Sequence, residues 1–405
     1  MCLILLLVAA GCGQDNQAVG TGTTQASGVT AAPAETQPAA ATQASPAESA
    51  VSVAPAATEA ATATSDATPA ESPAATSEAA TQTQEATTGT AASTATTAVV
   101  GEGSFQNPVL KYDFPDPGIL NVDGTYYAYA TNTSGRNVQL ARSTDLVRWD
   151  LLTDAMPALP TWAKGGLTWA PEVIQVGERF ALYFTARDKQ SNKQCVGVAT
   201  SDKPEGKFRD RGDRPLVCQD KEGGTIDANP FRDGDKLYLY FKNDGNCCGF
   251  ATWLYVQELA QDGLSVVGEP TRLVRNDRSW EGRVVEAPTM WKQDDKYYLF
   301  FSANNFAGLE YAVGYATCQS PMGPCEDAPE NPILKTSLQR PPVIGPGHQT
   351  VVLDDDGETW MVYHAWEVAP TGLKTNRRFM WIDQLTWEDG KPVVKGPTTA
   401  PQPKP

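Results

Sequence analysis

A short hairpin turn followed by an aromatic-rich strand occurs five times in this chain, and the repeat constrains the fold more than any other feature. The turns begin at Gly124, Gly177, Gly234, Asp295 and Gly357, so the steps between them are 53, 57, 61 and 62 residues. Steps of this length suit four short strands with their loops, and a series of four-stranded units is typical of β-propellers. Residues 105–398 contain no convincing amphipathic helix. The sequence therefore predicts an all-β fold, a five-bladed β-propeller over residues 105–398.

Three acidic residues stand in otherwise apolar segments just ahead of these turns. They are Asp116 in Phe-Pro-Asp-Pro, Asp227 in Thr-Ile-Asp-Ala and Glu286 in Val-Val-Glu-Ala-Pro. Burying a carboxylate among apolar neighbours costs free energy unless the group is paired or used chemically. Taken singly, each is more typical of a residue that caps a turn or bonds backbone amides, and only the recurrence at one place in the repeat favours a functional site. Because the first strand of every propeller blade lines the central channel, we expect the three carboxyl groups to converge at one channel mouth, where they suit acid/base chemistry.

An ordered set of segments resembles glycoside hydrolase family 43. The segments are 114–117, 169–172, 226–228, 285–289 and 345–348, followed by 363–365, 377–378 and 383–387. No single segment is specific, but their order and spacing over about residues 105–396 are. The resemblance implies a five-bladed propeller that hydrolyses arabinofuranosyl or xylosyl linkages with inversion at the anomeric carbon.

The resemblance also assigns roles to the three acids. Asp116 matches the general base, Glu286 the general acid, and Asp227 the carboxylate that orients the proton donor and keeps it protonated. Inversion needs a base and an acid roughly 6.5–9.5 Å apart, so that a water molecule fits opposite the leaving group. We expect Glu286 to be protonated beside an anionic Asp227, and Asp116 to be ionised because it is better solvated or hydrogen-bonded.

Five further residues are expected to bind substrate: Trp169, His348, Arg378, Phe114 and Phe306. Trp169 suits stacking against a sugar ring, although an aromatic residue in a blade core is an equal alternative. Arg378 or its neighbour Arg377 suits a forked contact with sugar hydroxyls, and the sequence does not say which one points inward. Phe114 and Phe306 are candidates for a subsite wall.

His348, one of only two histidines, occupies the channel position of the fifth repeat. The resemblance implies that it holds water or, in some family members, a calcium ion, whereas the plain alternative is a satisfied loop histidine. A single histidine without a clustered second ligand does not indicate a metal site. We therefore assign no metal and expect no required cofactor, and a structural calcium ion near His348 stays open.

The first twelve residues are typical of an export signal. Residues 3–8 are apolar but too few for a membrane span, and residues 8–12 (Val-Ala-Ala-Gly-Cys) resemble a bacterial lipobox. This predicts a lipoprotein-type signal over residues 1–12, lipidation of Cys12 and attachment to the cell surface through the lipid alone. The segment lacks basic residues, which leaves the true start open, and ordinary secretion with cleavage near Gly11 is the alternative.

Residues 13–104 contain no Lys, Arg, Leu, Ile, Met or aromatic residue, so they cannot bury a core and are expected to form a disordered linker. Nine of the 48 acidic residues and none of the 32 basic residues occur up to Glu102, so the remainder carries 39 acids against 32 bases. The sequence shows no cluster of basic residues that would indicate a nucleic-acid-binding protein. The expected partner is a plant cell-wall polysaccharide or oligosaccharide, bound by a monomer.

Six cysteines fall within the predicted propeller, and an even number in an exported chain favours disulfides. Cys318 with Cys325 suits a local bridge, and Cys195 with Cys218 suits closure of a loop in the second blade. The adjacent pair at 247–248 is open between a vicinal disulfide and free thiols. A metal site made of these cysteines is disfavoured because no two C-x₂-C pairs occur.

Several functions remain compatible with this pattern. Segments 240–246 and 273–282 are similar to those of arabinan- and arabinofuranoside-active members of the family, which favours arabinose substrates. A β-xylosidase of the same family and a non-catalytic glycan-binding propeller are the alternatives. A retaining fructosidase is disfavoured, because the first acid stands in Phe-Pro-Asp-Pro and not in Asn-Asp-Pro. The sequence does not separate exo from endo action.

Overall fold

The computed structural model describes residues 101–133, 135–210 and 212–405, which belong to the unit Glu85–Pro405. These residues form β-strands and three 3₁₀ helices, η1 (Asp220–Glu222), η2 (Gly245–Cys247) and η3 (Ser279–Glu281), and no α-helix. None of the helices in this part is long or apolar enough to cross a membrane. The predicted signal with Cys12, and the linker as far as residue 100, lie outside the described residues.

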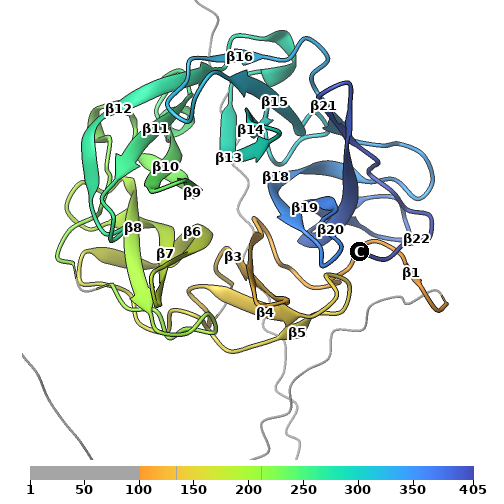
Figure 1. The fold of residues 1–405 in the computed structure, drawn as a ribbon, viewed down its shortest axis with the longest axis horizontal. Coiled ribbons are helices and arrows are strands. Elements are labelled where there is room, and N and C mark those ends of the chain that lie inside the picture. Colours follow the sequence, from red (N-terminus) through yellow and green to blue (C-terminus); the bar gives the residue numbers. More distant parts are fainter. Residues whose placement is uncertain (1–100, 134, 211) are drawn as a thin grey trace, which may run out of the picture. The chain divides into compact units, whose positions relative to one another are not determined.

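Five antiparallel sheets surround a central channel as the blades of a propeller, which confirms the predicted fold class (Figure 1). Blade 1 comprises β2 (Gly118–Val122), β3 (Thr125–Ala130), β4 (Gln139–Ser143) and β5 (Asp150–Leu151), and blade 2 comprises β6 (Ala163–Val176), β7 (Arg179–Asp188) and β8 (Gln194–Ser201). Blade 3 comprises β9 (Thr225–Asp233), β10 (Lys236–Asn243), β11 (Trp253–Leu259) and β12 (Val266–Arg275). Blade 4 comprises β13 (Val285–Gln293), β14 (Lys296–Ala303), β15 (Ala312–Cys318), β16 (Cys325–Asp327) and β17 (Leu334–Lys335). Blade 5 comprises β18 (Ile344–Leu353), β19 (Thr359–Val368), β20 (Lys374–Glu388) and β21 (Lys391–Val394).

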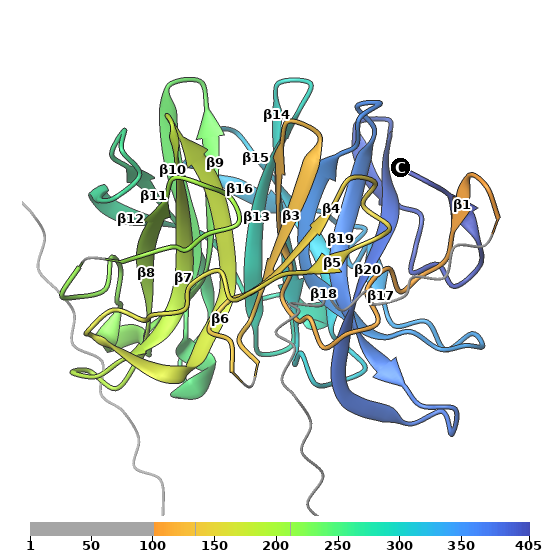
Figure 2. The same cartoon turned by 90° about the horizontal axis from the view of Figure 1, so that it is seen from below.

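The aromatic repeats are the second strands of the blades, and they are buried on both faces. Figure 2 shows the blades from the side, with strands running between the two faces of the ring. Each blade packs against its two neighbours, and one apolar core lies in each of the five interfaces. In the core between blades 1 and 2, for example, Tyr129 and Leu140 meet Leu182 and Phe184. A strand with two buried faces loses the usual alternation of polar and apolar residues, which explains the near-continuous apolar runs.

The first strand of each blade contacts the first strand of the next around the whole ring, so β2, β6, β9, β13 and β18 surround the channel. The ring is closed by residues near both ends of the described part. β1 (Ser104–Phe105) pairs with β22 (Gln402–Pro403), which lies beyond residue 398. The side chain of Asn107 then accepts a hydrogen bond from the amide of Ile382 (3.0 Å) and donates one to its carbonyl oxygen (2.8 Å). The segment continues along β20, where the Phe114 amide donates to the Arg378 carbonyl oxygen at 2.8 Å.

Replacing Asn107 by Ala is expected to lower the free energy of unfolding by about 2 kcal/mol, because the amide of Ile382 would be buried without its partner. Urea denaturation of the purified protein measures this change. Gln106→Ala is the matched control, because Gln106 donates only one hydrogen bond, to the carbonyl oxygen of Thr399. Equal stability of the two variants would show that Asn107 does not fasten the ring.

Candidate active site

In every blade, one residue other than glycine adopts the left-handed backbone conformation near the start of the inner strand. These residues and their φ angles are Asp116 (59°), Ala170 (44°), Asp227 (57°), Ala287 (52°) and His348 (51°). In blades 2 to 5 the pairing of the first and second strands shifts register at this position, as in a β-bulge, which re-aims the neighbouring side chains. The repeat therefore includes a shared backbone irregularity at the channel mouth.

The position of Glu286 differs by one residue from the predicted alignment. Asp116, Asp227 and His348 are the left-handed residues of their blades, whereas in blade 4 that residue is Ala287 and Glu286 precedes it. The residue equivalent to Glu286 in blade 2 is Trp169, which is half-buried. The reason is that hairpin lengths vary between blades, so counting back from each turn locates the irregularity only to within a residue.

The amides of the left-handed residues bind side chains from the preceding blade. Ala170 donates to Oγ1 of Thr131 (2.9 Å), Asp227 to Oγ1 of Thr185 (3.3 Å), His348 to Oγ of Ser302 (2.7 Å) and Asp116 to Nδ1 of His364 (3.2 Å). The corresponding residue of blade 3 is Lys242, whose ammonium group has no lone pair to accept such a bond. There the amide of Ala287 donates instead to Oδ2 of Asp227 (3.0 Å).

Asp116 is surrounded by groups that favour its ionised form. Nη1 of Arg378 lies 2.8 Å from its Oδ1, Nδ1 of His348 lies 3.4 Å from the same oxygen, and the hydroxyl of Thr131 donates to Oδ2 at 2.5 Å. Burial alone would raise the pKa of Asp116, but Arg378, His348 and His364 together hold it well below its usual range. Burial lowers the pKa of His364 itself to about 4, so that its ring is neutral at neutral pH.

Glu286 has a different set of partners. The hydroxyl of Tyr311 donates to its Oε1 at 2.8 Å, and the ring of Tyr311 stacks on that of His364. Nζ of Lys242 lies 3.2 Å from Oε2 and donates a second hydrogen bond to Oδ1 of Asn246 at 2.8 Å. The side chain of Lys242 is 0% exposed. Both oxygens of Glu286 are therefore fixed in position by buried side chains.

Asp227 is the carboxyl group that retains a proton. Burial raises its pKa to about 6 against the opposing charges of His348 and Lys242, and the negative charge of Glu286 adds to the rise. Since Asp227 and Glu286 interact, the proton belongs to the pair and is held up to about pH 6. The expected anionic state of Asp227 therefore applies only above about pH 6.

The substrate-binding candidates have different surroundings. The side chain of Phe114 is 0% exposed in the core between blades 1 and 5, so its prediction as a subsite wall is wrong. Arg378 points at Asp116, whereas Arg377 pairs with Glu367. Phe306 is exposed, stacks on Trp366, and lies 5.2 Å from the guanidinium carbon of Arg378.

Sequence reasoning missed four residues at this site: Thr131, Lys242, Tyr311 and His364. Three of them lie at the end of an aromatic strand, 7 or 8 residues after the first residue of the turn, so the repeat held a usable signal for them. A fifth, Glu172, lines the narrow channel together with Asp227 and His348, and burial raises its pKa to about 8. Tyr311 lies outside any repeated pattern and had no such signal.

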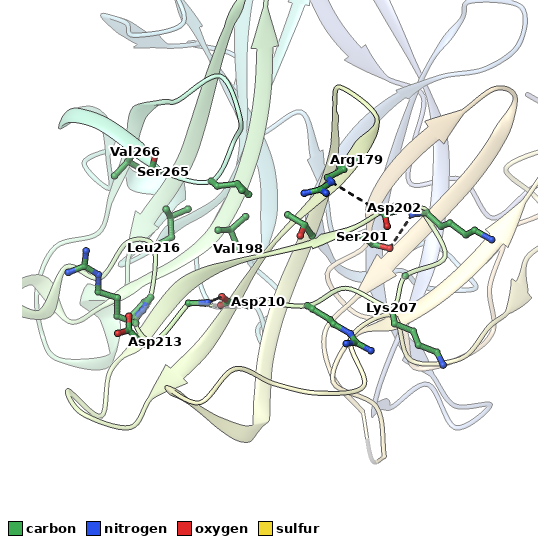
Figure 3. A pocket seen from close by; sticks show the side chains of 18 residues that line it. Arg179, Val198, Ser201, Asp202, Lys207, Asp210, Asp213, Leu216, Ser265 and Val266 are labelled. Atoms are coloured by element: carbon green, nitrogen blue, oxygen red, sulfur yellow. Dashed lines mark hydrogen bonds and ion pairs between the residues drawn. The ribbon is translucent and has the colours of Figure 1, made fainter.

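Two of the cavities in the described part of the chain bear on where the active site lies. One, of about 540 Å³, borders Glu286 and is lined by Asn246, Phe250 and Phe306 among others. Another, of about 960 Å³, lies between blade 2 with its loops and the start of β12 in blade 3, and its lining includes Arg179, Lys207 and Val266 (Figure 3). None of the candidate catalytic carboxyl groups lines the larger cavity, so its size does not make it the active site.

The structure pairs all six cysteines of the propeller: Cys195 with Cys218, Cys247 with Cys248, and Cys318 with Cys325. Among the described residues, the only group of three metal-ligating side chains close enough to share an ion is Cys195, Cys218 and Asp220. Both of its cysteines are in a disulfide and have no thiolate to offer. His348, Asp227 and Glu172 line the same channel, but their ligand atoms do not lie close enough together to form such a group.

A β-propeller with an ionised carboxylate and a separate proton-holding carboxyl pair at its channel mouth has the groups that a glycoside hydrolase needs. The profile of glycosyl hydrolases family 43 matches residues 105–392, and the chain belongs to this family. It is therefore a glycoside hydrolase, not the non-catalytic glycan-binding propeller considered above.

Known relatives carry several activities. The chain is 29% identical to the beta-D-galactofuranosidase xynD of Aspergillus niger, over 71% of this chain and 84% of that protein. It is 26% identical to a probable arabinan endo-1,5-alpha-L-arabinosidase A of Aspergillus flavus, over 69% and 90% of the two chains. Among solved structures, a thermostable family-43 glycoside hydrolase shares 33% identity with a TM-score of 0.68, over 74% and 98%. An endo-1,4-beta-xylanase from Bacteroides thetaiotaomicron shares 30% identity with a TM-score of 0.62, over 72% and 97%.

Replacing Arg378 by Gln is expected to raise the pKa of Asp116 toward its usual range, because the cation 2.8 Å from its carboxylate is removed. Carbon NMR of labelled aspartate, recorded against pH, measures the shift. In the wild type, the lowered pKa stabilises the fold above the unfolded-state value, and that stability is lost as pH falls through the folded-state value. Arg377→Gln is the control, and an equal pKa in both variants would contradict the assignment.

Proposed function

We propose that this protein is an inverting glycoside hydrolase that cleaves α-L-arabinofuranosyl linkages in arabinan or arabinoxylan of plant cell walls. The observation that carries the proposal is the contrast between two carboxyl environments at one channel mouth. Asp116 is paired with Arg378 and ionised, whereas burial and the negative charge of Glu286 raise the pKa of the neighbouring Asp227 to about 6. Such a division supplies a base and an acid at the same pH.

Asp116 acts as the general base in this proposal. Its Oδ2 is engaged by Thr131 and its Oδ1 by Arg378, so the carboxylate is held in one orientation. It takes a proton from a water molecule, which attacks the anomeric carbon from the face opposite the leaving group and inverts its configuration. Arg378 and His348, which contact Asp116, stabilise the anionic base and bind sugar hydroxyls.

Glu286 acts as the general acid and gives its proton to the glycosidic oxygen. Tyr311 and Lys242 fix its two oxygens, and Asp227 orients the adjoining peptide through the amide of Ala287. A negative charge on Asp227 disfavours a second one on Glu286 and returns the proton to the donor. The reaction uses water and carboxyl groups alone, so no cofactor is assigned to it.

Arabinose is favoured over xylose by segments 240–246 and 273–282 and by the relative named as an arabinan endo-arabinosidase. A β-xylosidase or xylanase activity is the second candidate, because a solved relative of 30% identity is named as an endo-1,4-beta-xylanase. Trp169 and Phe306 are the proposed aromatic contacts for the sugar. Calcium near His348 stays a prediction, and no step depends on it.

We further propose that the enzyme is exported and works outside the cell as a monomer. The three disulfides of the propeller suit an oxidising compartment outside the cytoplasm. The apolar segment and lipobox up to Cys12 support a lipid anchor at the cell surface, with secretion as the alternative. Mass spectrometry of the mature N-terminus distinguishes the two.

The proposed activity is tested with linear arabinan, arabinoxylan, an aryl arabinofuranoside and an aryl xyloside. The wild type is expected to release arabinose or arabino-oligosaccharides with inverted anomeric configuration, as followed by proton NMR. Glu286→Gln and Asp116→Asn are expected to lose about 10²–10⁴-fold in kcat. A substrate with an activated leaving group should restore the kcat of Glu286→Gln more than that of Asp116→Asn, because only the first variant lacks the proposed proton donor. Turnover of the xyloside alone would move the assignment to the second candidate.

The pH dependence tests the proton-holding pair. In the wild type, kcat/KM is expected to fall as pH rises through about 6, where the pair formed by Asp227 and Glu286 loses its proton. In Asp227→Asn the decline near pH 6 should be displaced, because the carboxyl group whose pKa is raised to about 6 has been removed. Coincident alkaline limbs in the two proteins would rule out this role for Asp227.

A further inference from the structure

The cavity of about 540 Å³ lies on the acid's side of the site. It borders Glu286, but none of its lining residues is Asp116, Asp227, His348 or Arg378. In an inverting hydrolysis the acid stands beside the leaving group, and the base stands on the opposite face of the sugar. A cavity that reaches only the acid is therefore placed to receive the leaving group.

Two exposed aromatic side chains line this cavity. Phe250 is 51% and Phe306 is 44% exposed, and they are the only aromatic residues among the exposed large apolar side chains of the described part. Exposed phenylalanine rings cost solvation free energy, and their faces suit the C–H face of a sugar ring. The other lining groups include the amides of Asn246, Asn276 and Asn304 and the guanidinium group of Arg283, all of which can donate hydrogen bonds to neutral hydroxyl groups.

The segment that carries Phe250 is held in place by several contacts. Its amide donates to the carbonyl oxygen of Gly245 at 2.9 Å, and the adjacent Cys247 and Cys248 are joined in a disulfide. Nδ2 of Asn243 donates to the carbonyl oxygen of Ala251 at 3.0 Å. A ring presented on such a fixed loop loses little conformational freedom when it binds a ligand.

This loop is also connected to the proton donor. Nζ of Lys242 donates to Oδ1 of Asn246 at 2.8 Å and lies 3.2 Å from Oε2 of Glu286. The second aromatic lining residue, Phe306, stacks on Trp366, whose Nε1 donates to the Phe306 carbonyl oxygen at 2.8 Å. Both aromatic walls are therefore fixed relative to the catalytic carboxyl groups.

We propose that this cavity is a subsite for the leaving group, with Phe250 as its stacking platform, and that it selects substrates whose leaving group is a neutral sugar of a glycan chain. The inference rests on the proposed glycosidase function, and deepens it by naming what the acid's side of the site binds. Lys242 is a positioning residue that links this subsite to Glu286.

The test compares two arabinosides that differ in the leaving group. An α-1,5-linked arabinotriose fills the cavity, whereas fluoride as the leaving group of an arabinofuranosyl fluoride is too small to reach it. The loss of kcat/KM in Phe250→Ala is expected to be about tenfold greater for the trisaccharide than for the fluoride, chiefly through KM. Phe250→Tyr keeps an aromatic ring at this position, so kcat/KM for the trisaccharide should return close to the wild-type value.

The controls separate the possible failures. Leu264→Ala removes an exposed apolar side chain from the cavity of about 960 Å³. This variant should hydrolyse both substrates with the kcat/KM of the wild type. Equal losses of Phe250→Ala on both substrates, or no loss at all, would overturn the subsite while leaving the glycosidase function intact. A wild type that hydrolyses neither substrate would instead refute the proposed function, and the subsite with it. Unchanged melting temperatures confirm that the variants fold.

Discussion

Hydrogen bonds between neighbouring blades fix the backbone of the channel mouth, and the arrangement of the carboxyl groups depends on them. A left-handed conformation of a residue other than glycine costs roughly 1–2 kcal/mol. A buried hydrogen bond to its amide returns about 1 kcal/mol, and Thr131, Thr185, Ser302 and His364 accept such bonds from the next blade. The ring thus stabilises an irregular backbone that re-aims the side chains of the inner strands.

Blade 3 lacks the hydrogen-bond acceptor that the other four blades provide at this position. Lys242 stands where the other blades carry an acceptor, so the amide of Ala287 binds the carboxylate of Asp227 instead. That substitution draws Asp227 toward the peptide of Glu286 and frees the ammonium group to contact Glu286 itself. One cation in place of a hydroxyl therefore couples two acids that belong to different blades. The pairing of Asp227 with Glu286 is a consequence of this local exchange.

The sequence was sufficient to predict the ring of blades, because aromatic strands buried on both faces and regular turns give a clear repeat along the chain. It also indicated Asp116 and Glu286, since buried carboxyl groups stand out in apolar segments. The off-by-one placement of Glu286 could not be avoided, because hairpin lengths differ between blades. The burial of Phe114 and the inward aim of His364 depend on packing between blades 1 and 5, which join residues more than 200 positions apart. Such contacts leave no mark in local spacing.

Closure of the ring also completes the surroundings of Asp116, the proposed base. The segment that leads to Asp116 runs along β20, where the Phe114 amide bonds the carbonyl oxygen of Arg378 and Oδ1 of Asp113 accepts the amide of Arg378. These bonds bring the guanidinium group of Arg378 to the carboxylate of Asp116. The cation that lowers the pKa of Asp116 therefore reaches it only when the first and last blades are joined. A propeller opened at this interface would retain four packed blade interfaces and the contact between Asp227 and the amide of Ala287, but Asp116 would lose the partner that keeps it ionised.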